Sequence, residues 1–252
     1  MTLQDLNTHA VSTMRRILVV DDEPDIRANL TDILGDLGYE VDTAGNGNEA
    51  LALVERKAYD VALIDLKMPG IDGLELYRRI KKIHSATVVI ITTAYAGGDT
   101  ARAAMAAGAW EIVSKPMDFN MLLPLIEGAL TQPAIIIVDD DTDLCDNLWS
   151  ILHDRRYRVG IAHDIDDAQA LIEARDFSIA LIDLKLPQGD GTQLLQLIKA
   201  RQPDARAILI SGHRAELDDA VRAATGPSPD AVCYKPIDIE SLLTTVRDLT
   251  RA

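Results

Sequence analysis

The fold is decided by the stretch Val61-Ala62-Leu63-Ile64-Asp65-Leu66-Lys67-Met68-Pro69-Gly70, an apolar run that delivers one carboxylate to a turn. A short apolar run bounded by turn residues is typical of a buried strand in a parallel sheet, with Asp65 at the end of the strand. The same run recurs over 179–187 with two conservative replacements. Because ligands of open α/β sheets bind at the carboxyl ends of strands, Asp65 and Asp183 are the first candidates for chemistry.

Segments with strand and helix patterns alternate on both sides of Asp65. Strand patterns are expected over five segments, which are 16–22, 39–44, 61–65, 87–93 and 111–114. Helical spacing of apolar residues fills the gaps, from Pro24 in the first helix to Leu130 in the last. Proline suits a first helical turn, because that position needs no N–H donor. Five strand–helix units in succession predict a doubly wound parallel sheet.

The second half of the chain repeats the first. An acid pair, a lone acid and a hydroxyl recur after 118 positions, and a lysine recurs after 120. A chain of 252 residues has room for two domains of ordinary size. We therefore predict an N-terminal lead-in over 1–14 and a first domain over 15–130. A short linker over 131–133 would join it to a second domain over 134–252.

The composition and charge of the chain indicate which kinds of molecule it can bind and where it is located. Asp and Glu number 40 against 25 Lys and Arg, a net charge of −15, which argues against binding to nucleic acid or to an anionic membrane. The sequence has neither the pattern of a signal peptide nor an 18-residue apolar run, so we expect a cytoplasmic protein. Cys145 and Cys233 are expected to be reduced thiols. The histidines expected at the surface, because they have no partner spacing, are His9, His84, His153 and His163.

Each half places the same polar groups where buried strands end. The residues are Asp21, Asp22, Asp65, Thr93 and Lys115 in the first half, and Asp139, Asp140, Asp183, Ser211 and Lys235 in the second. Three carboxylates at one sheet edge repel one another, and Mg²⁺ relieves this repulsion while accepting phosphate oxygens as further ligands. A carboxylate can then attack phosphorus, while a hydroxyl and an ammonium group hold the phosphoryl oxygens.

Each of these features alone has a simpler structural explanation. Two acids before a helix often cap it, a Thr or Ser after a strand is usually a turn residue, and Lys-Pro is usually part of a loop. Their joint recurrence, in the same order in both halves, is what favours a phosphoryl-transfer site.

Both halves resemble the receiver domains of two-component response regulators, over about residues 15–130 and 134–250. The motifs of the first half are Val19-Val20-Asp21-Asp22-Glu23-Pro24, Asp65-Leu66-Lys67-Met68-Pro69-Gly70-Ile71-Asp72-Gly73, Thr93-Ala94 and Lys115-Pro116. Those of the second half are Val138-Asp139-Asp140, Asp183-Leu184-Lys185-Leu186-Pro187-Gln188-Gly189-Asp190-Gly191, Ser211-Gly212 and Lys235-Pro236. The resemblance implies a flavodoxin-like fold with strand order 2-1-3-4-5 in each domain.

The resemblance also implies a function and a set of site residues. Asp65 and Asp183 would accept a phosphoryl group from a histidine kinase or a histidine phosphotransfer protein, with no enzymatic activity beyond self-catalysed phosphorylation and dephosphorylation. Mg²⁺ or Mn²⁺ would be held directly by two carboxylates and a backbone carbonyl, with a third carboxylate acting through water. These ligands are Asp22, Asp65, the Lys67 carbonyl and Asp21 in the first site, and Asp140, Asp183, the Lys185 carbonyl and Asp139 in the second.

Residues beside the site receive roles from the same resemblance. Thr93, Lys115, Ser211 and Lys235 would stabilise the phosphoryl group and act in the switch. The peptide bonds before Pro116 and Pro236 would be cis. Two further residues, Tyr95 and His213, either tune the access of water to the acyl phosphate or are ordinary solvated loop residues.

The chain departs from the family pattern at one position in each half. Family members often carry Tyr or Phe three residues before the lysine, a ring that swings inward when the hydroxyl moves toward the phosphoryl group. This chain has Ile112 and Val232 there, and Trp110 lies at a different position. We therefore expect phosphorylation to proceed while the readout is altered, through the helix–strand–helix face that ends at Leu130.

Two other functions fit the sequence less well. The segment 45–50 resembles a dinucleotide-binding fingerprint, but it follows the second strand and its counterpart over 163–168 has no glycine. A phosphatase of the haloacid-dehalogenase kind needs an acid two residues after the nucleophile, where this chain has Lys67 and Lys185.

Within the receiver interpretation, two arrangements stay open. The chain is a stand-alone tandem receiver that signals through protein contacts, or a piece of a regulator with an output domain. A second domain that is only a dimerisation adaptor is less favoured, because its acids, hydroxyl and lysine are all present. The downstream target stays unnamed, and a homodimer is compatible with each arrangement.

Overall fold

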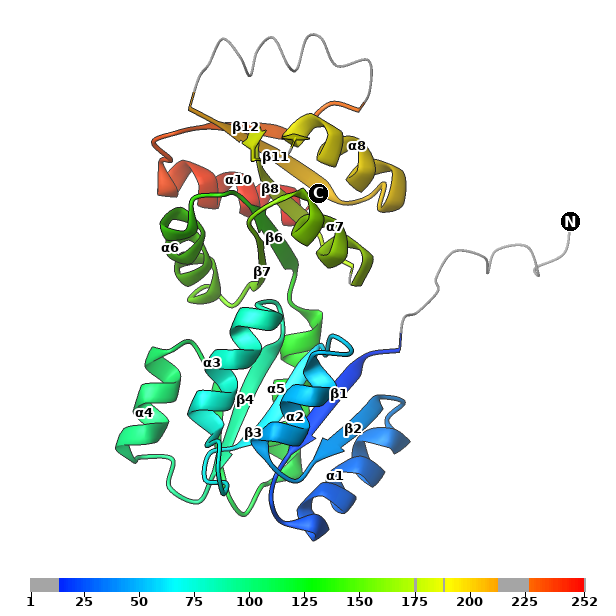
Figure 1. Ribbon diagram of the computed structural model, residues 1–252, viewed down its shortest axis with the longest axis vertical. Coiled ribbons are helices and arrows are strands. Elements are labelled where there is room, and N and C mark those ends of the chain that lie inside the picture. The colour runs from blue at the N-terminus through cyan, green and yellow to red at the C-terminus, as the bar shows by residue number, and fades with distance from the viewer. Residues whose placement is uncertain (1–13, 175, 188, 213–226, 252) are drawn as a thin grey trace, which may run out of the picture.

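The computed structural model describes residues 14–174, 176–187, 189–212 and 227–251, which form two α/β domains in succession (Figure 1). Strands of the first domain are β1 (Arg16–Val20), β2 (Glu40–Ala44), β3 (Val61–Asp65), β4 (Val88–Thr93) and β5 (Glu111–Ser114). The helices that alternate with them are α1 (Pro24–Asp36), α2 (Gly47–Val54), α3 (Gly73–Ile83), α4 (Asp99–Ala106) and α5 (Phe119–Thr131). In the drawing, this domain is the lower one and runs from blue to green.

The second domain repeats this alternation in its described part. Its main strands are β6 (Ala134–Val138), β7 (Arg158–Ala162), β8 (Ile179–Asp183), β11 (Arg206–Ser211) and β12 (Ala231–Tyr234). The described helices are α6 (Thr142–His153), α7 (Ile165–Ala174), α8 (Gly191–Arg201) and α10 (Ile239–Arg251). A small hairpin of β9 (Lys185–Leu186) and β10 (Gly189–Asp190), which was not predicted, follows β8.

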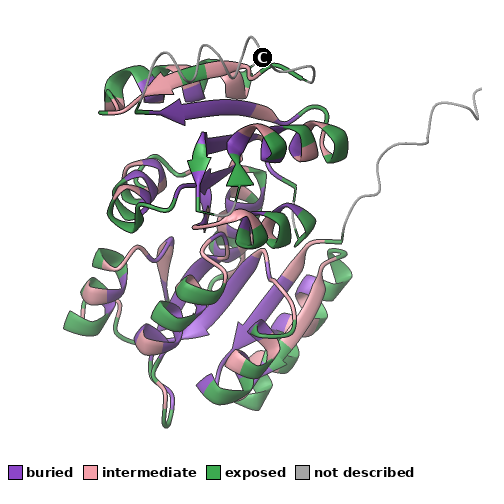
Figure 2. Ribbon diagram, turned by 45° about the horizontal axis from the view of Figure 1, so that its top comes forward, coloured by how far each residue is buried: buried purple, intermediate pink, exposed green. Residues whose placement is uncertain are grey.

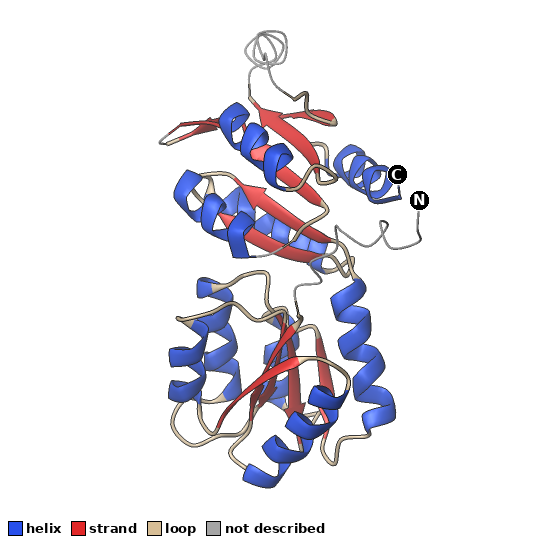
Figure 3. Ribbon diagram, turned by 90° about the vertical axis from the view of Figure 1, so that its right-hand side faces the viewer, coloured by secondary structure: helices blue, strands red, loops and turns tan. Residues whose placement is uncertain are grey.

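The strand order of the two sheets confirms the predicted fold class. The orders are β2-β1-β3-β4-β5 and β7-β6-β8-β11-β12, and every pairing within these two sheets is parallel. Figure 3 shows helices on both sides of each sheet. This arrangement follows from parallel pairing, because each crossover helix covers one face of the sheet.

The core of the first domain lies on both faces of its sheet, and β3 shows why. All five residues of β3 are buried, and its side chains alternate between two apolar clusters. Ala62 and Ile64 pack in one cluster with α2, α3 and α4, whereas Val61 and Leu63 pack in the other with α1 and α5. Figure 2 shows the sheet interiors as buried and the outer helix faces as exposed.

The segment that resembles a dinucleotide-binding fingerprint has a purely structural explanation. The Asn46 side chain caps α2 by accepting a hydrogen bond from the Glu49 backbone amide, and the Glu49 carboxylate accepts one from the Gly45 amide. This reciprocal pattern differs from a capping box only in that Glu49 accepts from the residue before the N-cap, and it needs no ligand.

The two domains pack against each other around an ion pair whose arginine is buried. Arg158, at the start of the edge strand β7, lies 3.1 Å from the Asp60 carboxylate just before β3, and its side chain is only 3 % exposed. Further along β7, the Ile161 amide donates to Ser85 Oγ of the first domain at 2.7 Å. Arg15 also pairs with Asp60. The N-terminal ends of the first sheet's strands therefore form the surface on which the second domain sits.

The expectation of surface histidines is wrong for His153. This residue ends α6, and its ring packs between Trp110 of the first domain and Trp149 of the second. Burial lowers the pKa of His153 to about 4. The reason for the error is that the contact joins residues of different domains, which no local spacing reveals. His84 and His163 are partly buried and contact backbone carbonyls, while His9 lies outside the described residues.

Both cysteines are free, as expected. Among the described helices, none combines the length and the apolar character that crossing a membrane requires.

Candidate functional site

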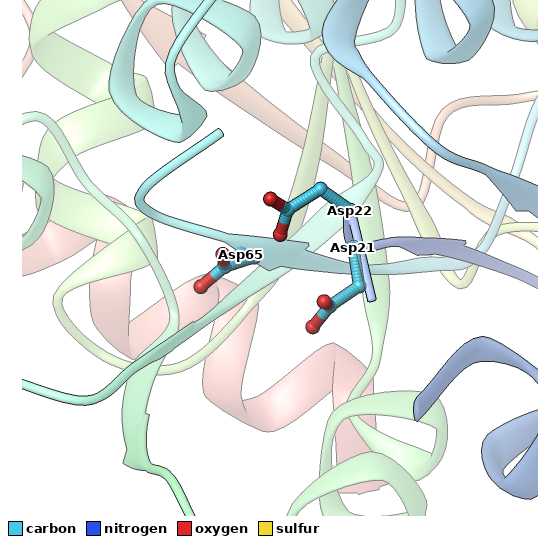
Figure 4. Close-up of side chains that lie close together, drawn as sticks. All are labelled: Asp21, Asp22 and Asp65. Atoms are coloured by element: carbon cyan, nitrogen blue, oxygen red, sulfur yellow. The ribbon is translucent and has the colours of Figure 1, made fainter. Parts of the chain in front are cut away.

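The first acidic site lies where β1 and β3 end side by side. Val20 is in register with Ile64, so the next residues, Asp21 and Asp65, emerge at the same sheet edge. One carboxylate oxygen from each of Asp21, Asp22 and Asp65 lies within 4.8 Å of the others. Figure 4 shows these carboxylates gathered at the strand ends. Asp21 and Asp65 are buried, and Asp22 is exposed.

Lys115 connects two of these carboxylates. Its Nζ atom lies 2.7 Å from Asp21 Oδ2 and 3.3 Å from Asp65 Oδ1. The peptide bond between Lys115 and Pro116 is cis, and the Lys115 amide donates to the Thr93 carbonyl at 2.8 Å. The cation therefore reaches the acid cluster from the end of β5.

Thr93 completes the edge between the acids and the lysine. It is the last residue of β4, is 1 % exposed, and pairs with Ser114 of β5. Its hydroxyl accepts a hydrogen bond from the Tyr95 amide at 3.2 Å. The sheet register thus brings together Asp21, Asp22, Asp65, Thr93 and Lys115, as the order of the strands predicts.

Burial and charge together set the protonation of this site. Burial raises the pKa of Asp65, and repulsion from Asp21 raises it further, while Lys115 opposes both effects. Burial alone would lower the pKa of Lys115, but its contacts with Asp21 and Asp65 outweigh burial, and the net pKa shift is upward. Lys115 is therefore a stable cation held against crowded acids.

A glycine lets the helix after the site approach the strand. A Cβ atom at Gly73 would lie 2.4 Å from the backbone oxygen of Asp65, and one at Gly191 would lie 2.3 Å from that of Asp183. No side chain fits such a distance, so both positions require glycine. This contact fixes the start of α3, and likewise of α8, against the strand that carries the aspartate.

The second site repeats the first. Asp139, Asp140 and Asp183 bring carboxylate oxygens within 4.8 Å of one another. Lys235 Nζ lies 2.8 Å from Asp139 Oδ2 and 3.5 Å from Asp183 Oδ1. The peptide bond between Lys235 and Pro236 is also cis.

Two details of the second site bear on its chemistry. Burial and the neighbouring Asp139 raise the pKa of Asp183. Ser211 is buried at the end of β11 and pairs with Tyr234 of β12, which places it beside Lys235.

The residues present fit a divalent cation. Each site offers three oxygen donors, which are the ligands that Mg²⁺ prefers. In the second site, Asp139 Oδ2 is buried and accepts no hydrogen bond of good geometry, although Lys235 forms an ion pair with it. A buried oxygen with unused acceptor capacity is suited to a cation. The predicted carbonyl ligands belong to Lys67, in the loop after β3, and Lys185, in the hairpin strand β9.

Tyr95 and His213 follow the hydroxyl residues Thr93 and Ser211 by two positions, and only Tyr95 lies in the described part of the chain. Tyr95 is 66 % exposed, and Lys67 Nζ lies 4.6 Å from its ring centroid. His213 lies outside the described residues.

Other residues contact the sites without having been predicted. Glu23 lies 3.5 Å from Lys115 Nζ. Arg27 donates to the carbonyl oxygen of Asp21, and the corresponding carbonyl of Asp139 instead meets Cys145 Sγ at 3.3 Å and His163 Nδ1 at 3.2 Å. Cys145 follows Arg27 by 118 positions, so an alignment of the two halves could have identified this difference.

The comparison with protein families gives two matches, one in each domain. The family model of the response regulator receiver domain matches residues 17–127 and 135–247. Both matches lie inside the predicted domain limits, and together they cover most of the chain.

Several relatives carry the same kind of domain. A response regulator receiver protein of Anaeromyxobacter sp. (strain Fw109-5) is 32% identical over 239 residues, which are 94% of this chain and 96% of that protein. The response regulator protein PilR of Pseudomonas aeruginosa is 40% identical over 46% of this chain, and the DNA-binding transcriptional regulator NtrC of Salmonella typhimurium is 41% identical over the same share. The chain spans only 26% of PilR and 25% of NtrC.

Two solved structures of response regulator proteins also match, each over just under half of this chain. A CheY-like receiver domain protein from Methanospirillum hungatei is 34% identical with a TM-score of 0.46, and the match covers 47% of this chain and 94% of that one. The response regulator TrrA of Thermotoga maritima, solved in complex with Mg(2+)-BeF, is 42% identical with a TM-score of 0.41, covering 45% of this chain and 97% of that one.

Receiver domains are signalling modules of two-component systems, and they bind Mg²⁺ at an acidic pocket. This chain has two clusters of three carboxylates, on two sheets of the same strand order, and two matches to the family model. The chain therefore belongs to the response regulator receiver family and carries two receiver domains in tandem.

Proposed function

We propose that Asp65 and Asp183 each accept a phosphoryl group from a histidine kinase or a histidine phosphotransfer protein. The observation that carries this proposal is the arrangement of Lys115 Nζ 3.3 Å from an Asp65 oxygen, beside a buried Thr93, with the same arrangement in the second domain. A nucleophile, a cation and a hydroxyl at one edge of a sheet can hold the charge of a transferring phosphoryl group.

The chemistry of the step is a transfer from nitrogen to oxygen. An oxygen of the Asp65 carboxylate attacks phosphorus, the phosphorus–nitrogen bond of the donor imidazole breaks, and the imidazole keeps the electron pair and takes up a proton. A divalent cation held by Asp22, Asp65 and the Lys67 carbonyl, with Asp21 acting through water, would supply charge neutralisation for the carboxylates and for the incoming phosphoryl oxygens.

Residues of the chain then hold the product. Lys115 already lies beside the acceptor oxygen, so a small movement would let it contact a phosphoryl group there. Thr93 would turn its hydroxyl toward the same group. Attack by water on phosphorus would later break the bond between phosphorus and the carboxylate oxygen, which releases inorganic phosphate and regenerates the carboxylate. In the second domain the same parts would be played by Asp139, Asp140, the Lys185 carbonyl, Ser211 and Lys235.

The signal would pass on through protein contacts, and we propose the cytoplasm as the compartment where the donor meets the protein. The acidic composition supports a protein partner rather than nucleic acid or membrane. A dehalogenase-type phosphatase is not favoured, because Lys67 and Lys185 occupy the positions of its general acid.

The proposal is tested by intact-mass analysis after incubation with acetyl phosphate and Mg²⁺. The wild type should gain up to two phosphoryl groups. Asp65→Ala and Asp183→Ala should each gain at most one, and the double variant none. Equal uptake by the double variant and the wild type would contradict the proposal, and turnover of a generic phosphate ester would favour the phosphatase instead.

A further inference from the structure

The end of α6 in the second domain covers the turn between α4 and β5 of the first. His153 Nε2 donates to the Gly108 carbonyl at 2.9 Å, and Arg156 Nη1 donates to the Trp110 carbonyl at 2.6 Å. Arg156 also pairs with Glu111 at 3.3 Å. In Figure 1, α6 lies on the side of the second domain that faces the first. We call residues 107–111 the gripped turn.

Aromatic rings fill the same contact. The Trp110 ring stacks on His153 with centroids 5.6 Å apart, and the Trp149 ring meets the edge of His153 at 4.5 Å. Lys81 of α3 lies 3.4 Å above the Trp149 ring. A Cβ atom at Gly108 would lie 2.4 Å from Trp149, and Gly108 has φ of +96°. The gripped turn and the C-terminal end of α6 therefore have complementary shapes.

Arg156, which makes this contact, has a backbone conformation that is energetically unfavourable for a residue with a side chain. Arg156 has φ of 65°, and among the described residues it is the only one other than glycine with a positive φ. Its counterpart in the first domain is Gly38, 118 positions earlier, with φ of 86°. Glycine adopts this conformation freely, whereas a side chain makes it unfavourable. An arginine at this position is best explained by what its side chain binds, which is the gripped turn.

The gripped turn is continuous with the proposed phosphoryl-binding residues. It lies on the segment 94–114 that joins Thr93 to Lys115. Tyr77 Oη donates to the Ala107 carbonyl, and the Trp110 amide donates to Val89 of β4, so the turn is also tied to α3 and β4. Position 112 holds a half-buried Ile rather than an aromatic ring, and the buried aromatic ring of this segment is Trp110, at the domain contact.

We propose that the second domain is the built-in partner that reads the phosphorylation state of the first, through the gripped turn. This inference rests on the proposed function. A change at Thr93 and Lys115 alters the segment between them, and Trp149, His153 and Arg156 register the change. The separate contact of Asp60 with Arg158 keeps the domains together, so the signal is a local rearrangement and not a separation.

The chain contains its own reporter for a test. It has only two tryptophans, Trp110 and Trp149, and both lie in this contact, at 6% and 9% exposure. In Asp183→Ala, where only the first site can be loaded, acetyl phosphate with Mg²⁺ should shift the tryptophan emission in step with the gain in intact mass. In Asp65→Ala the emission should stay unchanged.

A pair of neighbouring arginines provides the matched control. Arg156→Gly, made in the Asp183→Ala background, removes the grip while relieving the backbone, so it should fold and gain mass but lose most of the emission shift. Arg155→Gly should keep the shift, because the Arg155 side chain bonds only to the Ile151 carbonyl of its own helix among the described contacts.

Two results would overturn the inference in different ways. A gain of mass at Asp65 without any emission shift would overturn the reading by the second domain and leave the proposed function intact. No gain of mass would overturn the proposed function, and the inference with it.

Discussion

At the scale of single residues, each lysine of a site holds two acids that would otherwise repel each other. Lys115 Nζ lies within 3.3 Å of Asp65 and closer still to Asp21. Because both carboxylates are buried, removing the cation leaves their repulsion without relief. A divalent cation could take over this role, since it would sit among the same oxygens.

We predict that Lys115→Met lowers the free energy of unfolding by about 1–3 kcal/mol without Mg²⁺, because two buried acceptors lose their charged partner. Mg²⁺ should restore more stability in this variant than in the wild type. Thermal denaturation with and without Mg²⁺ measures both effects. Lys82→Met, at an exposed position of α3, serves as the control and should change little; equal behaviour of the two variants would contradict the prediction.

His153 gives the domain contact a dependence on pH. Burial, with help from Lys81 and Arg156, lowers its pKa to about 4 from an ordinary value of 6.5. The unfolded chain therefore binds a proton on this residue at higher pH than the folded chain does, and stability is lost as the pH falls from about 6.5 toward about 4.

The loss attributable to His153 should reach roughly 3 kcal/mol at the acid end of this window, at about 1.4 kcal/mol for each pH unit. Other groups also titrate there, so the measurement is the difference between the wild type and His153→Gln in denaturant unfolding over this pH range. Glutamine keeps a donor for the Gly108 carbonyl but cannot take up a proton. Parallel pH profiles for the two proteins would show that His153 is not the cause.

At the scale of elements, local sequence patterns were sufficient to predict most of the strands of the first domain. The sequence predicted β5 at its observed bounds, and β2 and β4 to within one residue. Of these three, only β4 is a fully buried strand, whereas the edge strands β2 and β5 mix polar with apolar residues. The hairpin of β9 and β10 was missed, since strands of two residues have no pattern to recognise. The contacts of Arg27, Cys145 and His163 with backbone carbonyls were missed because they depend on how a helix or loop packs against the end of a strand, which no local pattern shows.

The contact between the end of β3 and the start of α3 leaves no room for one added carbon atom. We predict that Gly73→Ala costs about 1–3 kcal/mol, because its Cβ would press on the Asp65 carbonyl and shift the strand end that carries the acceptor. Phosphoryl uptake at Asp65 should fall with it.

The matched control is Gly35→Ala in α1, where nothing lies within 4 Å of the added atom. That substitution should be neutral or stabilise the protein by up to about 1 kcal/mol, as is usual for alanine in a helix. Denaturant unfolding compares the two variants, and an equally mild effect of Gly73→Ala would show that the close approach is not needed.

At the scale of the whole molecule, the duplication predicted two domains but not their contact. Arg158 begins a strand and Asp60 precedes one, and nothing in either segment indicates that they meet across 98 residues of sequence. Burial lowers the pKa of Arg158, and Asp60 opposes this effect. The ion pair therefore matters chiefly because losing one partner would leave the other charge buried.

We predict that Asp60→Ala lowers the free energy of unfolding by about 3–5 kcal/mol, because the Arg158 guanidinium is left buried without its carboxylate. Asp60→Ala combined with Arg158→Leu should recover part of the loss, since the stranded charge is removed. A double-mutant cycle in denaturant measures this coupling. Strictly additive losses would show that the two side chains act independently.

The central claim is that the aspartates at the ends of β3 and β8 become acyl phosphates. The most direct measurement is to treat the protein with acetyl phosphate and Mg²⁺, reduce it with borohydride, and locate the product by peptide mass spectrometry. Borohydride converts an aspartyl phosphate to homoserine, so the account predicts homoserine at positions 65 and 183. Homoserine at other aspartates, with Asp65 and Asp183 unmodified, would contradict it.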